Sequence, residues 1–273
     1  MPVNQAAPIL KHTLLDLLSD MRSRAQVVAS MAERIPLTRD IALFSSKFYS
    51  VGRGYDVYFI LGSQILKLPK SRGLIFNFQF GKTLRASSEA VVVLVDRDCP
   101  AICTFRAVTT YILAAQRTGW DSTTGHLFPV VTTEGGRGSL RLFAARMTTA
   151  LQGHLRAAGL PSHFTMHSFR VGGSLSKSLA GTEVDEIMKI GGWKTESVAK
   201  YHIGATSSDK IHGSKRKHGQ SYASAIELPL SPEFQEDFAA CARKDWSSYS
   251  LGLFKYDSFV SFRAFGRTWG IRG

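Results

Sequence analysis

The chain has 273 residues, enough to bury a core in one large domain or in two smaller ones. Its 34 lysines and arginines outnumber 21 aspartates and glutamates, and the resulting net charge of +13 favours nucleic acid as a partner. No run of about 18 apolar residues predicts a membrane span, no signal peptide is recognisable, and the three cysteines lack the spacing of a zinc site or a disulfide framework. We therefore expect no membrane partner and no secretion.

The first eighty residues change from a helical to a strand pattern. Apolar residues from Ile9 to Met31 recur at three- and four-residue spacing, which predicts one or two helices that end at Pro36. A further helix is predicted from Arg39 to Tyr49. Short alternating or β-branched runs then predict a small antiparallel sheet. These runs lie at 65–68, 76–80 and 91–95.

Helical periodicity returns after residue 101, so the expected fold class is α+β, mostly helical with a small antiparallel sheet. Thr182 and Asp185 have the spacing of a capping box, which predicts a helix start there. Beyond Gly204 the sequence has no clear period and includes a basic cluster at 215–218. Five helices are predicted, at 104–117, 141–158, 169–179, 183–190 and 196–203.

Several side chains of these elements have the chemistry needed to break a DNA phosphodiester without a metal. Such a reaction needs cations around the phosphate, a proton donor for the departing oxygen, a base and a nucleophile. Each residue taken alone has a commoner structural explanation, such as a solvated loop arginine or a core tryptophan. The candidates are Arg53, Lys82, His167, Arg170, Trp193 and Tyr201.

The order and spacing of these candidates resemble the tyrosine recombinase and phage integrase family. The most specific part is His167-Ser168-Phe169-Arg170 followed by Gly191-Gly192-Trp193, which resembles a Cre-like catalytic domain. Gly81-Lys82-Thr83-Leu84-Arg85 is similar to recombinases of eukaryotic mobile elements, such as DIRS-like retrotransposons and cryptons. The resemblance covers residues 35–205 and implies the catalytic fold of that family.

The resemblance also implies how the phosphate would be held. Arg53 and Arg170 would clamp the scissile phosphate, and Asp56 would orient the Arg53 guanidinium. Lys82 would protonate the leaving 5′ oxygen. Trp193 would donate its indole N–H to a phosphate oxygen.

The implied chemistry is a strand transfer that keeps the energy of the phosphoester bond. Tyr201 would attack the phosphorus and form a 3′-phosphotyrosine, with His167 taking part in the proton transfer. Neither ATP nor a metal is needed, so no cofactor is expected. The implied partner is double-stranded DNA, and relatives of this kind suggest self-assembly into a synaptic tetramer. The protein would work in the nucleus of a eukaryote, or otherwise in the cytoplasm.

Two features depart from the family pattern. Family members usually carry a helical core-binding domain before the catalytic one, so residues 1–35 are interpreted as a remnant or linker of that region, and a truncated copy is one hypothesis. Residues 36–205 would form the catalytic domain and 206–273 an unassigned basic tail. In many relatives the tyrosine stands nine positions after the histidine or tryptophan of this motif, whereas here Tyr201 is eight positions after Trp193 and the ninth position is His202.

Three other functions stay open at the level of sequence. A decayed mobile-element copy would bind DNA without cutting it. A type IB topoisomerase uses a similar residue set, although the Gly-Gly-Trp context argues against it. A metal hydrolase could use His163 and His167, but no acidic residue of the H-E-x-x-H kind lies between them.

Overall fold

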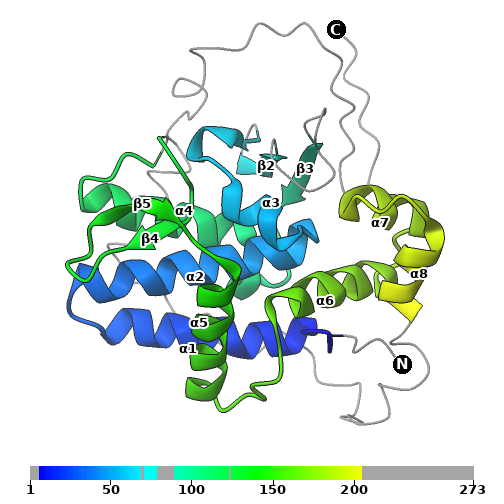
Figure 1. Cartoon of the computed structure of the whole chain (residues 1–273), viewed down its shortest axis with the longest axis horizontal. Coiled ribbons are helices and arrows are strands. Elements are labelled where there is room, and N and C mark those ends of the chain that lie inside the picture. Colours follow the sequence, from blue (N-terminus) through cyan, green and yellow to red (C-terminus); the bar gives the residue numbers. More distant parts are fainter. Residues whose placement is uncertain (1–5, 69–70, 79–88, 123, 205–273) are drawn as a thin grey trace, which may run out of the picture.

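The computed structural model describes residues 6–68, 71–78, 89–122 and 124–204 (Figure 1). The predicted proton donor Lys82, and the basic cluster at 215–218, lie outside these described residues. Within them, no helix is both long and apolar enough to cross a membrane.

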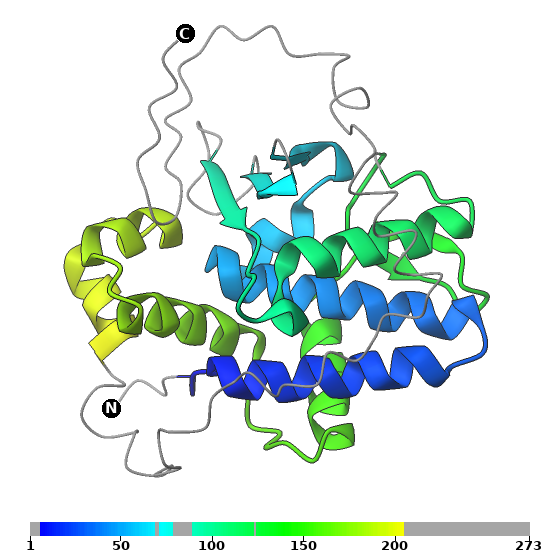
Figure 2. The same ribbon diagram turned by 180° about the vertical axis from the view of Figure 1, so that it is seen from behind.

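Two long helices form the base of the molecule. Helix α1 (Lys11–Val27) lies alongside α2 (Met31–Ser50), and α4 (Thr104–Arg117) packs on the other side of α2 (Figures 1 and 2). The Ser30 hydroxyl caps α2 by accepting a hydrogen bond from the Glu33 amide at 3.3 Å. The predicted helix end at Pro36 is wrong, because α2 continues through this proline. Burial of the following turns of α2 outweighs the one backbone hydrogen bond that a proline cannot donate.

The predicted antiparallel sheet is confirmed. Strands β1 (Ile65–Lys67), β2 (Gly73–Phe78) and β3 (Glu89–Leu94) pair in the order β1-β2-β3, with Phe76 opposite both Ile65 and Val91. Helix α3 (Gly54–Phe59) and a short 3₁₀ turn (Gly62–Gln64) connect α2 to this sheet, and a second 3₁₀ turn (Pro100–Ile102) precedes α4. A second, two-stranded sheet of β4 (Pro129–Val131) and β5 (Arg137–Arg141) was not predicted, because these runs lack the alternation of a typical strand.

The five later helices were predicted, with ends that differ by at most three residues. They are α4 and, after it, α5 (Ala144–Ala157), α6 (Met166–Leu179), α7 (Val184–Gly191) and α8 (Glu196–Gly204). The capping box at Thr182 and Asp185 is wrong, because Glu183 is the N-cap of α7 and its side chain makes no capping hydrogen bond. A capping box does start α6, where the Thr165 amide donates to the Ser168 hydroxyl at 3.0 Å.

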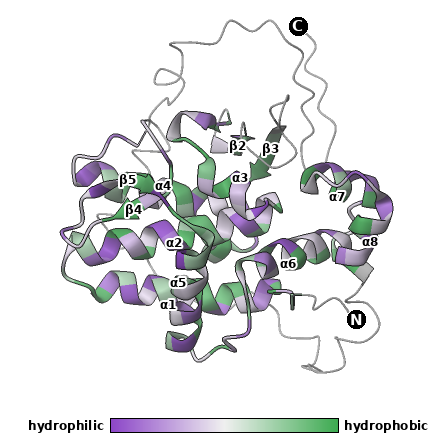
Figure 3. Cartoon of the chain, in the orientation of Figure 1, coloured by the Kyte–Doolittle hydropathy of each residue, from purple (hydrophilic) through white to green (hydrophobic). Residues whose placement is uncertain are grey.

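One hydrophobic core joins the helical layers. The rings of Phe44 from α2 and Phe169 from α6 stack at 5.1 Å between centroids, and Leu14 and Leu17 of α1 belong to the same core. Figure 3 shows apolar residues along the helix faces that meet in the interior and polar residues on the outer faces. The domain boundary expected after residue 35 falls inside α2. The chain therefore presents α6, α7 and α8 at one end of a single packed body (Figure 1).

Candidate active site

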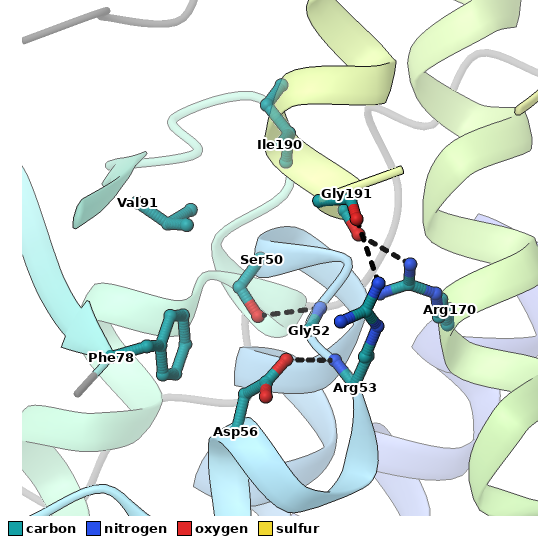
Figure 4. A pocket seen from close by; sticks show the side chains of 10 residues that line it. Ser50, Gly52, Arg53, Asp56, Phe78, Val91, Arg170, Ile190 and Gly191 are labelled. Carbon is teal, nitrogen blue, oxygen red and sulfur yellow. Dashed lines mark hydrogen bonds between the residues drawn. The ribbon is translucent and has the colours of Figure 1, made fainter. Parts of the chain in front are cut away.

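The end of α2 positions Arg53. Val51 ends the helix in the left-handed conformation (φ 52°), and the Gly52 amide donates to the Ser50 hydroxyl at 3.2 Å. Arg53 is then the N-cap of α3, and its amide donates to Oδ2 of Asp56 at 3.0 Å. The side chain reaches toward the end of α7, where Nη2 donates to the Gly192 carbonyl at 2.8 Å (Figure 4).

Helix α6 brings Arg170 to the same place. Arg170 is 3% exposed, and its guanidinium donates through Nη1 to the Val51 carbonyl at 2.6 Å and through Nη2 to the Gly191 carbonyl at 2.5 Å. Gly173 allows this approach, because a Cβ there would collide with the Phe48 carbonyl of α2. Arg170 therefore ties the end of α2 to the end of α7.

The Gly-Gly-Trp segment closes this site. Gly192 ends α7 with φ 59°, a conformation that favours glycine, and the chain turns so that Trp193 folds back over Gly191. A Cβ on Gly191 would stand 2.5 Å from the Trp193 ring, so only glycine leaves room for it. The indole ring then faces Arg170, whose Cζ lies 4.4 Å from the ring centroid, a cation–π contact.

Two histidines and a tyrosine lie at the open edge of the site. The His202 ring stacks on Trp193 with centroids 4.9 Å apart and planes at 21°, and it meets His167 edge-on at 5.3 Å. Tyr201 is 43% exposed, and its ring centroid lies 5.8 Å from that of His202. Of the two neighbouring positions of α8, the one that faces Trp193 and His167 is therefore 202.

The electrostatics of the site favour an anion. The pocket is lined by Arg53, Asp56 and Arg170 together with Gly191 and Gly192 (Figure 4). Two arginines thus face one carboxyl group, and burial raises the pKa of Asp56 although the Arg53 amide and the surrounding cations oppose this. Among the residues that line the pocket, the two arginines outnumber the single carboxyl group of Asp56, an arrangement that suits an anion.

Both imidazoles hold their protons weakly. Burial lowers the pKa of His202 to about 4, with contributions from the neighbouring charges of His167 and Arg170. Desolvation, Arg170 and Lys47 likewise lower the pKa of His167. Both rings are therefore neutral near pH 7, and a neutral imidazole can accept a proton from an attacking hydroxyl.

Sequence reasoning missed one charged residue beside this site. Lys47 in the last turn of α2 is 1% exposed, and burial together with Arg170 lowers its pKa to about 7. Its position three residues after Phe44 and four after Leu43, both buried, places it on the apolar face of the helix. A lysine on such a face was the signal that could have revealed it.

The structure thus brings most of the predicted residues together. Arg53 and Arg170 meet at the end of α7, Trp193 covers Arg170, and His167 lies beside His202 at the edge. Tyr201 lies on the same helix turn but more exposed, and Lys82 lies outside the described residues. No three His, Cys, Asp or Glu side chains in the described ranges gather as a metal site requires.

Solved structures share this fold. The XerH site-specific recombinase, in a pre-cleavage complex with its difH substrate, is 11% identical and aligns with a TM-score of 0.53 over 72% of this chain and 49% of its own. The XerA recombinase is 14% identical, with a TM-score of 0.53 over 90% of this chain and 66% of its own. No protein-family model and no curated protein sequence matches.

The likeness to XerH and XerA confirms the fold that the sequence resemblance predicted, the mostly helical catalytic fold of tyrosine recombinases. The chain spans about half the length of XerH and just under two thirds of XerA. The narrower resemblance to DIRS-like and crypton recombinases stays a prediction.

Proposed function

We propose that the protein cleaves and rejoins duplex DNA through a covalent 3′-phosphotyrosine intermediate. The observation that carries this proposal is the meeting of Arg53 and Arg170 at the carbonyls of Gly191 and Gly192. The charges of two neighbouring guanidinium groups repel each other, and a bound anion would offset that repulsion. A DNA phosphate supplies that anion, and preorganised donors around it stabilise the charge that develops during phosphoryl transfer.

The proposed step is a transesterification. The Tyr201 oxygen attacks the phosphorus, the bond from phosphorus to the 5′ oxygen breaks, and the phosphate stays attached to the 3′ end. His167 accepts the proton of the tyrosine hydroxyl, which its neutral state permits. Reversal by a 5′ hydroxyl of another strand restores the DNA. The step consumes neither water nor ATP, because one phosphoester replaces another.

Lys82 is the proposed proton donor to the leaving oxygen. It follows β2 in the sequence and lies outside the described residues, so the proposal rests on the sequence resemblance. Lys82→Ala should slow cleavage of ordinary DNA strongly. On a substrate with a 5′-bridging sulfur, whose departure needs no proton, the variant should approach the wild-type rate. Equal defects on both substrates would remove Lys82 from this role.

The test of cleavage is a covalent adduct. A duplex with a nick beside the scissile phosphate releases a short fragment after cleavage and traps the protein on the DNA. Wild-type protein should form an adduct that survives denaturing electrophoresis, and Tyr201→Phe should abolish it while DNA binding persists. An adduct formed equally well by Tyr201→Phe would exclude this tyrosine as the nucleophile.

A second candidate function is DNA binding without cleavage. The observation that favours it is the orientation of α8, in which His202 rather than Tyr201 contacts Trp193 and His167. In a decayed copy the nucleophile would have been lost at position 202. The wild type would then form no adduct, whereas His202→Tyr would create one.

The proposed partner is double-stranded DNA, bound mainly through its phosphates, with synapsis through a tetramer. The net charge of +13 supports DNA as the partner, and log affinity should fall with log salt by about 0.9 per phosphate contacted. A nearly flat salt dependence would contradict it. Tetramers on DNA can be sought by analytical ultracentrifugation. Action in the nucleus, if the protein is eukaryotic, is part of the same proposal.

A further inference from the structure

Lys47 is a buried cation directly behind the arginine site. Its side chain is 1% exposed, and Nζ lies 5.3 Å from the centroid of the Tyr58 ring. The start of α3 lies directly beside the ammonium group, since a Cβ at Gly54 would stand in ordinary contact with Nζ, at 3.9 Å. Lys47 therefore fills the space between the end of α2 and the start of α3, the two elements that position Arg53.

Charged groups face Lys47 from both neighbouring helices. Asp56 of α3 favours the charged form, and its Oδ1 is buried without a hydrogen-bond partner among the described residues. Arg170 of α6 disfavours the charged form, and His167 of the same helix is affected by the charge of Lys47 in turn. Tyr58 contributes its ring face and a buried hydroxyl that also lacks a partner among the described residues.

These surroundings leave Lys47 close to the balance between its neutral amine form and its charged ammonium form. Burial and Arg170 lower its pKa to about 7, whereas Asp56 and the C-terminal end of α2 favour the ammonium form. An anion bound at the two arginines would offset the repulsion from Arg170 and add an attraction of its own. In the dry interior such a charge acts over several ångströms with little screening.

We propose that Lys47 is a proton-linked positioning residue, which takes up a proton when a DNA phosphate binds between Arg53 and Arg170. This inference rests on the proposed function, because it needs a DNA phosphate at that site. The ammonium group would then pair with Asp56, hold the start of α3 in place and strengthen the positive field behind the phosphate. Lys47 would act from behind the two arginines, through the start of α3 and the local field, and not by contact with the DNA.

The experiment measures protons taken up on binding. The full chain is titrated calorimetrically with a duplex oligonucleotide at pH 8, in several buffers that differ in ionisation enthalpy. The slope of the observed binding enthalpy against the buffer ionisation enthalpy gives the number of protons taken up. Wild type should take up about 0.5 to 1 proton per chain, because Lys47 is largely neutral before binding. At this pH both site histidines are already neutral, since the pKa of each is lowered.

Lys177 provides a matched control. It is another buried lysine, with a pKa that burial lowers to about 7, but the carboxyl group that faces it is Glu186 of α7 rather than a group of the arginine site. Lys47→Met should reduce the proton uptake to near zero, whereas Lys177→Met should keep the wild-type value. Lys47→Arg, which is charged throughout, should also lose the uptake while it retains binding.

The outcomes separate this inference from the function on which it rests. Absence of saturable binding heat with wild type would overturn the proposed function and the inference with it. Binding without proton uptake by the wild type, or equal uptake by wild type and Lys47→Met, would overturn the inference alone. If Lys47→Met fails to fold by circular dichroism, Lys47→Arg and the wild-type value still decide it.

Discussion

The two sides of the candidate site are built in different ways. We call Arg53, Arg170 and the carbonyls of Val51, Gly191 and Gly192 the arginine joint; it is held by hydrogen bonds of 2.5 to 2.8 Å to the main chain. On the other side, α8 is held at the site by ring contacts, in which His202 stacks on Trp193 and Tyr201 is 43% exposed.

This difference shows which part of the site the fold itself holds in place. Main-chain carbonyls at helix ends fix a guanidinium in position and direction. Ring contacts hold two surfaces together but allow one helix to rotate or shift along the other. Neighbouring residues of a helix are separated by a rotation of about 100°. The two guanidinium groups are therefore fixed in direction, whereas the position of the proposed nucleophile Tyr201 depends on how α8 packs against Trp193.

The largest effect on stability is expected for Lys47, which lies behind the arginine joint. The pKa of Lys47 falls from 10.5 in an unfolded chain to about 7, so the folded state binds this proton less tightly than the unfolded state. The free energy of unfolding should rise with pH between about 7 and 10, and the charge should cost on the order of 5 kcal/mol below pH 7. Urea titrations should show Lys47→Met to be more stable than wild type at pH 6 and similar at pH 10. Equal stability at pH 6 would contradict this.

A substitution within the arginine joint should change the free energy of unfolding slightly less, but it should remove most of the cleavage activity. Arg170→Lys cannot reach both carbonyls with one ammonium group, so it should lose about 2 to 4 kcal/mol of stability. Adduct formation should fall about 100- to 1000-fold, as for the loss of one preorganised donor. Arg146→Lys on the exposed surface of α5 is the control for stability and should unfold like the wild type. An Arg170→Lys variant of wild-type activity would show that the joint does not bind the reacting phosphate.

The contact between the two sides can be tested at Trp193. Trp193→Leu removes the ring that lies 4.4 Å from Arg170 and 4.9 Å from His202. We expect a loss of about 1 to 2 kcal/mol in stability and about tenfold in the rate of adduct formation. Thermal unfolding and single-turnover cleavage would measure the two effects. A defect in cleavage as large as that of Arg170→Lys would mean that Trp193 is no less important to the phosphate than the joint.

The smallest effect on adduct formation is expected for substitution of His202. His202→Phe keeps a flat ring for Trp193 but removes both nitrogens. If Tyr201 is the nucleophile and His167 its base, adduct formation should change by no more than about threefold, because no proton passes through position 202. A single-turnover pH profile would check this. A drop of more than about tenfold would give His202 a chemical role.

Much of this fold could be predicted from the sequence, because the helices of one packed body carry a regular apolar period. Phe76 and Phe78 alternate with polar residues clearly enough to reveal β2. By contrast, Arg137–Arg141 pairs with Pro129–Val131 through main-chain hydrogen bonds, and no side-chain pattern predicts this pairing. The helix end predicted at Pro36 was wrong, because local propensity yields to the burial of the whole helix.

The sequence named residues that the structure brings together at the candidate site, but it did not reveal how they are connected. His167, Arg170 and Trp193 stand in a specific motif, yet nothing in the motif reveals that Arg170 binds carbonyls of two other helix ends. Lys47 could be found only by its place on an apolar helix face. The inward position of His202 depends on where α8 begins after the Gly-Gly-Trp turn, and helix boundaries are poorly determined by sequence.

The most direct test of the account is the identity of the residue joined to DNA. Wild-type protein trapped on a nicked duplex would be digested with nuclease and trypsin, and the peptide that carries the remaining nucleotide would be sequenced by mass spectrometry. We expect an acid-stable phosphotyrosine at Tyr201. Absence of any adduct, or an acid-labile phosphohistidine at His202, would contradict it.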